Sequence, residues 1–138
     1  MNSPQTTGMK RILIIDDEPS VVMYLETLLQ DNGYATATAG NGREGFEEAK
    51  RERPDLVCLD ITMPEESGIR FYRNLKGDPE LKSVPVVVVT AVTGYGGDSE
   101  PFEKFLSTRK QVPPPEAFFS KPIDRQEFLD AVGRLLSA

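Results

Sequence analysis

Polar residues that can handle phosphate or metal ions come directly after four apolar stretches of the chain. Two carboxylates, Asp16 and Asp17, follow the first stretch, and a third, Asp60, ends another. The hydroxyl of Thr90 and the ammonium of Lys121 stand at the ends of two more. A charged group at the end of a buried stretch is placed for chemistry rather than for packing. These residues offer three carboxylates, a hydroxyl and an ammonium group.

Three carboxylates at one place repel one another. Each pair costs about 3 kcal/mol at a separation of about 5 Å and an effective dielectric constant of about 20. A divalent cation would neutralise the cluster, and a site with only oxygen ligands favours Mg²⁺. Asp60 would then attack a phosphoryl group, while Thr90 and Lys121 bind the phosphoryl oxygens. The predicted product is an aspartyl phosphate on Asp60.

The elements that must position these residues alternate between strands and helices. Apolar or β-branched runs predict strands at residues 11–15, 34–39, 56–59, 85–89 and 117–120. Helical spacing with terminal proline or glycine predicts helices at residues 19–32, 43–53, 68–76 and from 124 onward. This alternation indicates an α/β fold, a doubly wound parallel sheet with helices on both faces. The carboxyl ends of its strands share one edge, which brings the polar residues together.

Composition narrows the function further. The 138 residues suit one domain, and the net charge of −6 argues against direct binding of nucleic acid. The chain has no histidine, which excludes histidine-based zinc sites and Ser-His or Cys-His pairs. The single cysteine, Cys58, cannot form an internal disulfide, so a cytoplasmic location is predicted. No apolar run is long enough to span a membrane, and residues 1–9 are expected to form a disordered tail.

Several separated motifs occur in order along the chain: Asp16-Asp17, Asp60 with Met63-Pro64 and Gly68, Thr90-Ala91, and Lys121-Pro122. In this arrangement the chain resembles the receiver domain of bacterial two-component response regulators, with residues 10–138 as the expected domain. The resemblance implies a flavodoxin-like sheet of five parallel strands in the order 2-1-3-4-5. It also implies that Asp60 accepts its phosphoryl group from the phosphohistidine of a sensor histidine kinase or a phosphotransfer protein.

The resemblance assigns further roles. The expected ligands of Mg²⁺, or of Mn²⁺, are the carboxylates of Asp16, Asp17 and Asp60 and the backbone carbonyl of Thr62. Lys121 would contact the phosphoryl group, and the Lys121-Pro122 bond is expected to be cis. Thr90 would be the switch hydroxyl and Phe118 the switch aromatic. Phosphorylation would thereby change the surface around residues 92–138, for binding of an unidentified downstream protein or for dimerisation.

One stretch departs from the family pattern. The stretch of residues 92–116 is longer than the corresponding stretch of related receivers. A short helix is predicted near residues 100–109. We expect residues 94–115 to form a partner-specific surface, the alternative being a tolerated loop insertion. Thr62 and Val92 flank the expected path of the water that hydrolyses the acyl phosphate. Because Val92 has no polar group to orient that water, slow self-dephosphorylation is predicted.

Two other functions compete with a phosphoacceptor signalling module. A small-molecule phosphatase with an aspartate nucleophile typically carries a second acid two residues later, where this chain has Thr62. A scaffold that works without phosphorylation would keep only the fold. In the leading interpretation the protein is not an enzyme for other substrates, because it catalyses only its own phosphorylation and dephosphorylation.

Overall fold

A five-stranded sheet forms the centre of the computed structural model, which describes residues 9–90 and 114–137. The strands are β1 (Arg11–Ile15), β2 (Ala35–Ala39), β3 (Leu56–Asp60), β4 (Val86–Thr90) and β5 (Ala117–Ser120). All neighbouring strands are parallel, and their order is β2-β1-β3-β4-β5. The predicted α/β fold and the predicted strand order 2-1-3-4-5 are confirmed.

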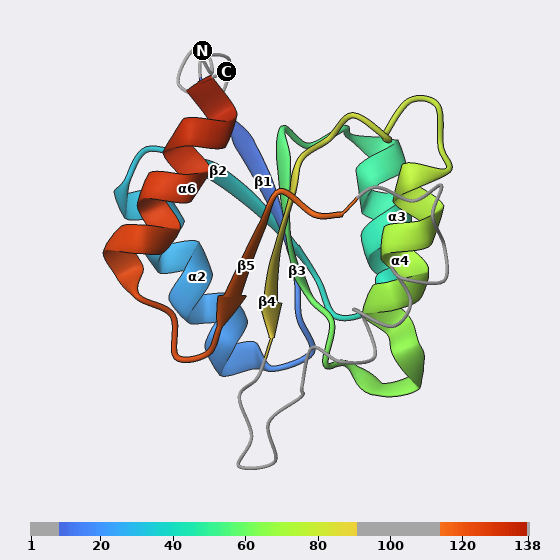
Figure 1. The fold of residues 1–138 in the computed structure, drawn as a ribbon, viewed down its shortest axis with the longest axis horizontal. Coiled ribbons are helices and arrows are strands. Elements are labelled where there is room, and N and C mark those ends of the chain that lie inside the picture. The colour runs from blue at the N-terminus through green and yellow to red at the C-terminus, as the bar shows by residue number, and fades with distance from the viewer. Residues whose placement is uncertain (1–8, 91–113, 138) are drawn as a thin grey trace.

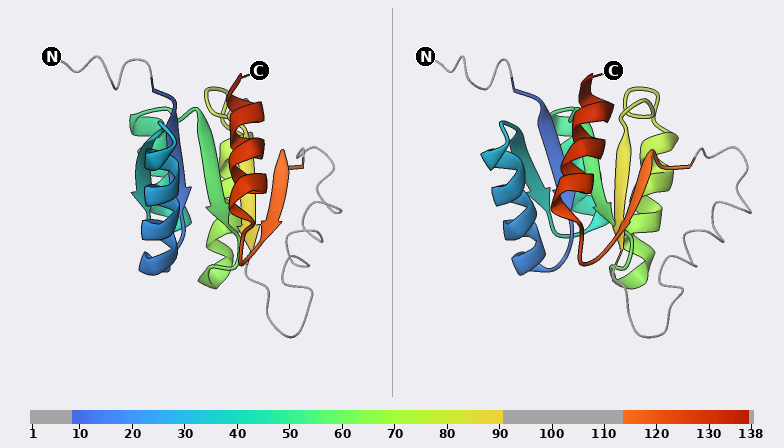
Figure 2. Two further views of the ribbon diagram at one scale, coloured as in Figure 1. Left: turned by 90° about the vertical axis from the view of Figure 1, so that its left-hand side faces the viewer. Right: turned by 60° about the vertical axis from the view of Figure 1, so that its left-hand side comes forward.

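Helices cover both faces of this sheet (Figures 1 and 2). One face carries α2 (Pro19–Asp31) and α6 (Arg125–Ser137), and the other carries α3 (Gly42–Arg51) and α4 (Ser67–Lys76). A 3₁₀ turn, η1 (Pro64–Glu66), leads into α4. None of the helices in the described residues is long and apolar enough to cross a membrane.

Local sequence explains where the helices begin and end. Pro19 is the first residue of α2. A backbone N–H at this position has no hydrogen-bond acceptor within the helix, so proline, which lacks the N–H, is tolerated there. Asn41 caps α3 by accepting the backbone N–H of Glu44 at 2.9 Å, and Asp124 accepts that of Glu127 before α6. Gly33 follows α2 with a φ of +92°, a conformation that glycine adopts without strain. These residues gave the start and stop signals in the sequence.

The core has two layers, because alternate residues of each strand point to opposite faces of the sheet. The layer beneath α2 and α6 joins Leu25, Leu29, Phe128 and Val132 to Ile12, Ile14, Leu56, Cys58, Val87 and Val89. The layer beneath α3 and α4 joins Ala49, Ile69, Tyr72 and Leu75 to Leu13, Ile15, Val57, Leu59, Val86 and Val88. Full burial of one large aliphatic side chain stabilises a fold by about 1.5–3 kcal/mol. The apolar strand residues that anchor the site are therefore rigidly packed on both sides.

Several predictions fall outside the described residues, which leave out 1–8 and 91–113. These are most of the tail at residues 1–9, the short helix, and most of the stretch 92–116 with its partner surface.

Glu116 lies within the described part and joins β5 to β4. Its backbone N–H donates to the carbonyl of Val86 at 3.0 Å, and its Oε1 accepts the N–H of Val86 at 2.7 Å. The boundaries of the domain at residues 10–138 stay a prediction.

Candidate functional site

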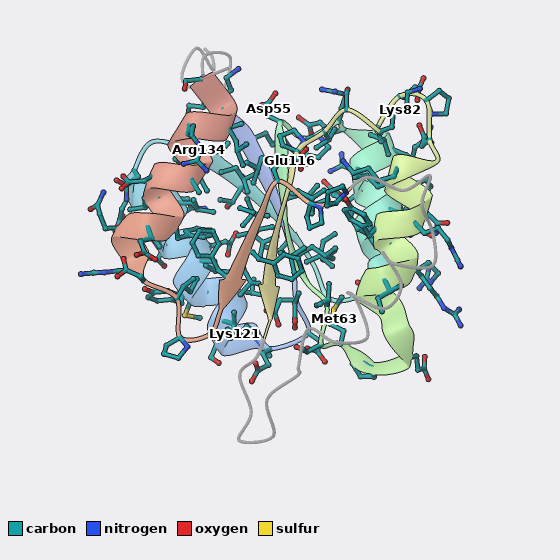
Figure 3. The ribbon with its side chains drawn as sticks, in the orientation of Figure 1. Asp55, Met63, Lys82, Glu116, Lys121 and Arg134 are labelled. Atoms are coloured by element: carbon teal, nitrogen blue, oxygen red, sulfur yellow. The ribbon has the colours of Figure 1, made fainter. Side chains whose placement is uncertain are left out.

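The carboxyl ends of the strands form one edge of the sheet, and most of the predicted polar residues gather there. Asp16 follows β1, Asp60 ends β3, and Lys121 follows β5. Lys121 and Met63 lie at this end of the sheet, whereas Asp55 lies at the opposite end (Figure 3). The strand order reverses between β1 and β3, which is the usual place for a ligand site in an open α/β sheet.

Asp16, Asp17 and Asp60 form a compact cluster of carboxylates. One oxygen atom from each of them lies within 4.8 Å of the other two. Asp16 and Asp60 are each only 3% exposed, whereas Asp17 is exposed to solvent. A set of oxygen donors on neighbouring strands suits a hard divalent cation, so the residues present fit the predicted Mg²⁺ in their donor chemistry.

Asp60 is held in one orientation by Thr62. Its Oδ1 accepts hydrogen bonds from the backbone N–H of Thr62, at 2.8 Å, and from the Thr62 hydroxyl. Its Oδ2 faces Lys121, whose Nζ lies 3.7 Å away. Gly68 lets the following helix approach this strand end, since a Cβ atom there would lie 2.5 Å from the carbonyl oxygen of Asp60. The two carboxylate oxygens of Asp60 therefore have different surroundings.

Burial dominates the electrostatics of Asp16. Its Oδ1 accepts the backbone N–H of Glu18 at 2.9 Å, and its Oδ2 lies 3.2 Å from Nζ of Lys121. Burial raises the pKa of Asp16 to about 6. The Glu18 N–H lowers this pKa, the nearby Asp60 carboxylate raises it, and Lys121 lowers it. The raised pKa shows that the charge of this carboxylate is incompletely compensated, and a bound cation would compensate it.

Lys121 is the ammonium group that faces these carboxylates. Its Nζ lies 3.2 Å from Asp16, 3.6 Å from Glu18 and 3.7 Å from Asp60. Burial lowers the pKa of Lys121, but the Asp60 and Asp16 carboxylates raise it by more, so the net shift is upward. The side chain is therefore charged at neutral pH. The Lys121–Pro122 peptide bond is cis, as predicted.

Comparisons with known proteins agree with this geometry. The sequence model of one protein family, the response regulator receiver domain, matches residues 12–133 of this chain. The chain belongs to this family. Protein PilH of Pseudomonas aeruginosa is 31% identical over 129 residues, which are 94% of this chain and 99% of PilH. The polar-differentiation response regulator DivK of Brucella anthropi is 34% identical over 123 residues, which are 89% of this chain and 93% of DivK.

Solved structures support the same family. The chemotaxis protein CheY4 of Vibrio cholerae superposes with a TM-score of 0.77 at 28% identity, over 94% of this chain and 100% of that one. The receiver is thus a signalling domain of the two-component type, as its motifs predicted. Its acidic cluster lies where a phosphoacceptor site of this family is expected.

The receiver's remaining predicted residues are only partly described. Thr90 ends β4, where its backbone is in register with Ser120, but its side chain is not among those described. Phe118 lies on β5 opposite Val88, and its side chain is 40% exposed. Val92 lies outside the described residues. The structure brings together the side chains of Asp16, Asp17, Asp60, Thr62 and Lys121. The switch roles of Thr90 and Phe118 stay predictions.

Two contacts at this site were not predicted from the sequence. Glu18 adds a fourth carboxylate near Lys121 and ties Asp16 through its backbone N–H. Because Glu18 directly follows two aspartates at a strand end, its place at the site could have been predicted from the sequence. The hydroxyl of Thr62 bonds to Asp60, whereas only its carbonyl and its place beside the water path were predicted. A threonine two residues after an aspartate can make such a local bond.

Cys58 has no part in this chemistry. Burial, with the Asp16 and Asp60 carboxylates nearby, raises the pKa of its thiol to about 12. The thiol therefore stays protonated at neutral pH, and the protonated form is a poor nucleophile. Cys58 is instead a small residue of the core, 2% exposed.

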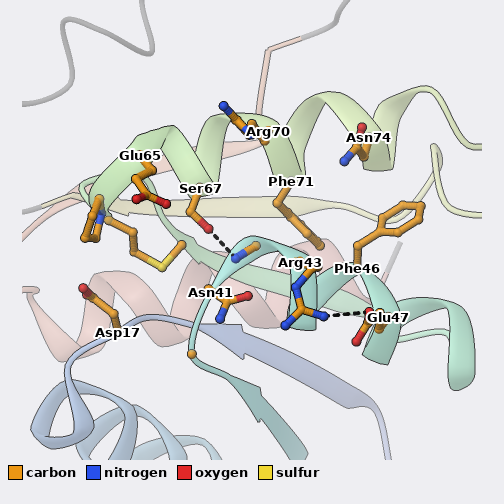
Figure 4. Close-up of a pocket in the computed structure, with 14 residues that line it drawn as sticks. Asp17, Asn41, Arg43, Phe46, Glu47, Glu65, Ser67, Arg70, Phe71 and Asn74 are labelled. Atoms are coloured by element: carbon orange, nitrogen blue, oxygen red, sulfur yellow. Dashed lines mark hydrogen bonds and ion pairs between the residues drawn. The ribbon is translucent and has the colours of Figure 1, made fainter.

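A groove of about 680 Å³ lies beside the site, between α3 and α4 (Figure 4). Asp17 and the loop of Met63, Pro64 and Glu65 line the groove together with residues of both helices. No role for this groove was predicted from the sequence.

Proposed function

We propose that Asp60 accepts a phosphoryl group from the phosphohistidine of a sensor histidine kinase or a phosphotransfer protein. The observation that carries this proposal is the unequal environment of its two oxygens. Thr62 holds Oδ1 with two hydrogen bonds, and Oδ2 faces the ammonium of Lys121 at 3.7 Å. Oδ2 is therefore left to act as the nucleophile, beside a cation that can bind the incoming phosphoryl oxygens.

Asp16, Asp17 and Asp60 are the side chains that would hold Mg²⁺, or Mn²⁺, in this proposal. The backbone carbonyl of Thr62 is the fourth expected ligand, on the family resemblance. The 4.8 Å span of the carboxylate oxygens and the raised pKa of Asp16 support this assignment. When bound, the cation supplies positive charge that offsets the charge on the phosphoryl oxygens.

In the transfer step, Oδ2 of Asp60 forms a bond to the phosphorus atom. The bond from phosphorus to the donor's imidazole nitrogen breaks, and its electron pair stays on that nitrogen. Thr62 keeps the carboxylate oriented so that Oδ2 is presented to the phosphorus. Lys121 contacts both Asp16 and Asp60, so its ammonium needs only a small movement to bind a phosphoryl oxygen.

The Thr62 hydroxyl should also shorten the lifetime of the phosphate. In hydrolysis, water attacks the phosphorus and the bond from phosphorus to Oδ2 breaks, which releases the Asp60 carboxylate. A hydrogen bond to Oδ1 is stronger when the group is a carboxylate than when it is an acyl phosphate. It therefore favours release. Val92 keeps its predicted opposite effect, as an apolar neighbour of the attacking water.

The surface around the site suits a protein donor. Met23 of α2 is 68% exposed and Tyr24 is 44% exposed, which is unusual for large apolar side chains. Met23 and Asp17 line one hollow, and Tyr24 and Lys121 line a second. Apolar surface thus flanks the carboxylates, and we place the donor domain there.

The output side of the proposal follows the family resemblance. Thr90 would move toward the phosphoryl group and Phe118 inward, which changes the surface around residues 92–138 for a downstream protein or a second copy. The protein would catalyse only its own phosphorylation and dephosphorylation. A cytoplasmic location is proposed because the buried Cys58 thiol forms no disulfide in the described residues.

Intact mass spectrometry after incubation with acetyl phosphate and Mg²⁺ tests the proposal. The wild type should gain one base-labile phosphate, and Asp60→Asn should gain none. Asp31→Asn is the matched control, because Asp31 is exposed at the end of α2 and should leave the phosphate gain unchanged. Continuous release of inorganic phosphate in large excess over protein would instead indicate a phosphatase. No phosphate on the wild type would refute the phosphoacceptor role.

A further inference from the structure

The groove between α3 and α4 opens beyond a tight contact of the two helices. At their first turns, the backbone N–H of Gly42 donates to the hydroxyl of Ser67 (Figure 4). A Cβ atom at Gly42 would collide with the carbonyl oxygen of Ser67, so only glycine allows this approach. Beyond the contact, a groove of about 680 Å³ remains between the helices. This volume is in the range of sites that take up a ligand or a large side chain.

Aromatic side chains from both helices line the groove. Phe46 of α3 and Phe71 of α4 project into the space between the helices (Figure 4), and Met63 also lines the groove. Phe71 and Met63 are buried, whereas Phe46 is only partly buried. Phe46 therefore supplies the aromatic surface of the groove that a large apolar side chain of a partner could cover.

The α4 wall of the groove carries positive charge that no acidic residue of the same helix offsets. From Ser67 to Lys76 this helix has three basic residues and no acidic one. Arg70 lines the groove, Arg73 is exposed one turn further, and neither makes a hydrogen bond or ion pair within the described residues. Across the groove, Arg43 is already paired with Glu47 at 3.0 Å. Two arginines on one helix face without a partner in the described part of the chain are unusual for a protein of net charge −6.

We propose that this groove is the docking site for an acidic segment of a partner protein. The segment inserts one large apolar side chain between Phe46 and Phe71, and its carboxylates pair with Arg70 and Arg73. An amphipathic helix fits a groove of this kind, since residues three and four apart lie on one side of it. Such a helix places its apolar and its acidic residues on adjoining stripes.

Charge at the other end of the groove sets the direction of the segment. Asp17 and Glu65 line the groove beside the phosphoacceptor loop, and both carboxylates are exposed. They repel an acidic group placed near them, so the acidic part of the segment lies toward Arg70 and Arg73. The inference needs no phosphate on Asp60, and unphosphorylated protein can test it independently of the proposed function.

Fluorescence anisotropy with a labelled helical peptide tests the docking site. The probe consists of glutamates and alanines around one central phenylalanine. We expect Arg70→Glu to weaken its binding about tenfold, as for a charge pair replaced by a repulsion. Arg125→Glu is the matched control: Arg125 is exposed on α6, across the sheet from the groove (Figure 1), and makes the same change in net charge. Its binding should stay within about twofold of wild type, since distant surface charges are screened.

A second set of measurements tests the apolar anchor. A probe with alanine in place of its phenylalanine should bind at least about tenfold more weakly, as expected for loss of a buried aromatic anchor. Phe46→Ala should have the same effect on the original probe, provided that its circular dichroism matches wild type. Absence of probe binding to the wild type, equal weakening by Arg70→Glu and Arg125→Glu, or indifference to the phenylalanine would each overturn the proposal. So would sedimentation showing a dimer that Arg70→Glu dissociates, because the occupant would then be a second copy.

Discussion

The carboxylates at the two ends of the sheet differ in their charged neighbours. At the amino end, Arg11 pairs with Glu48 at 2.6 Å and Glu52 at 3.5 Å, and its backbone N–H donates to Asp55 at 2.8 Å. At the carboxyl end, the carboxylates of Asp16, Glu18 and Asp60 lie within 3.7 Å of the ammonium of Lys121, and Asp17 belongs to the same carboxylate cluster. Within the described residues, Glu48 at the first end pairs with two guanidinium groups, those of Arg11 and Arg51, whereas three carboxylates at the second end share one ammonium.

The pKa shifts follow this difference. Hydrogen bonding to Arg51, helped by Arg11 and opposed by burial, lowers the pKa of Glu48. Burial raises the pKa of Asp16 to about 6. A lowered carboxylate pKa stabilises the folded state at neutral pH, and a raised one destabilises it. The comparison indicates that ion pairs stabilise the amino end of the sheet. The carboxylates at the carboxyl end are instead arranged in a way that suits binding of a cation and a phosphoryl group.

The largest expected effect comes from removing the ammonium group of Lys121 at the carboxyl end. Lys121→Met should slow phosphorylation by acetyl phosphate about a hundredfold, as is typical when one preorganised charge at a reacting group is lost. The rate is measured by quenched-flow or by intact mass at fixed Mg²⁺. Lys82→Met serves as control, because Lys82 is exposed and should leave the rate unchanged. A normal rate in Lys121→Met would show that this ammonium does not contact the phosphoryl group.

The second prediction concerns the close contact between α4 and the end of the strand that carries Asp60. Gly68→Ala should lower the free energy of unfolding by about 1–3 kcal/mol, because the new Cβ forces the helix and strand end apart. Its Cβ would lie 2.5 Å from the Asp60 carbonyl oxygen. Gly133→Ala in α6 meets only the Tyr34 hydroxyl, at 3.8 Å, and should instead gain about 0.5–1 kcal/mol. Urea denaturation measures both, and equal effects would contradict the close approach at Gly68.

The pH dependence of stability should have opposite signs at the two ends. In the absence of divalent cations, Asp16 titrates at about 6 when folded but near its ordinary 3.8 when unfolded. Its contribution therefore falls as the pH rises from about 4 to about 6, so Asp16→Asn should melt above wild type at neutral pH. Glu48 contributes stability that is lost as the pH falls through its lowered pKa, so Glu48→Gln should melt below wild type at neutral pH.

Melting curves in a chelating buffer check this pair. The Asp16→Asn difference should shrink below about pH 4, where Asp16 is protonated in both states, and the Glu48→Gln difference should shrink as the pH falls through the lowered pKa of Glu48. Asp16→Asn melting below wild type at neutral pH would show that the charge of the buried Asp16 carboxylate is compensated after all.

The smallest expected effect concerns a strained residue at the carboxyl end. Glu65 has a φ of +60°, which costs energy for any residue with a Cβ. Glu65→Gly should raise the free energy of unfolding by about 0.5–1 kcal/mol. Glu47→Gly, in the middle of α3, should lower it by about 1 kcal/mol. Chemical denaturation measures both, and a loss of stability in Glu65→Gly would mean that its side chain holds the loop.

Much of the fold and site could be predicted because the signals are local. The apolar runs at 11–15, 56–59 and 85–89 can only be buried strands, and Pro19, Gly33 and Asn41 punctuate the helices between them. Once parallel strands are inferred, their carboxyl ends must share an edge, which brings Asp16, Asp60 and Lys121 together. The strand order came from the family resemblance.

What the sequence by itself determined is therefore the set of candidate site residues and the sheet edge on which they stand. Only the tertiary structure decided which oxygen of Asp60 is held by Thr62 and which faces Lys121, because that depends on side-chain torsions set by packing. The same holds for the contact of Glu18 with Lys121 and for the groove beside Arg70. These features join residues from different elements, and their distances are fixed only when the helices pack on the sheet.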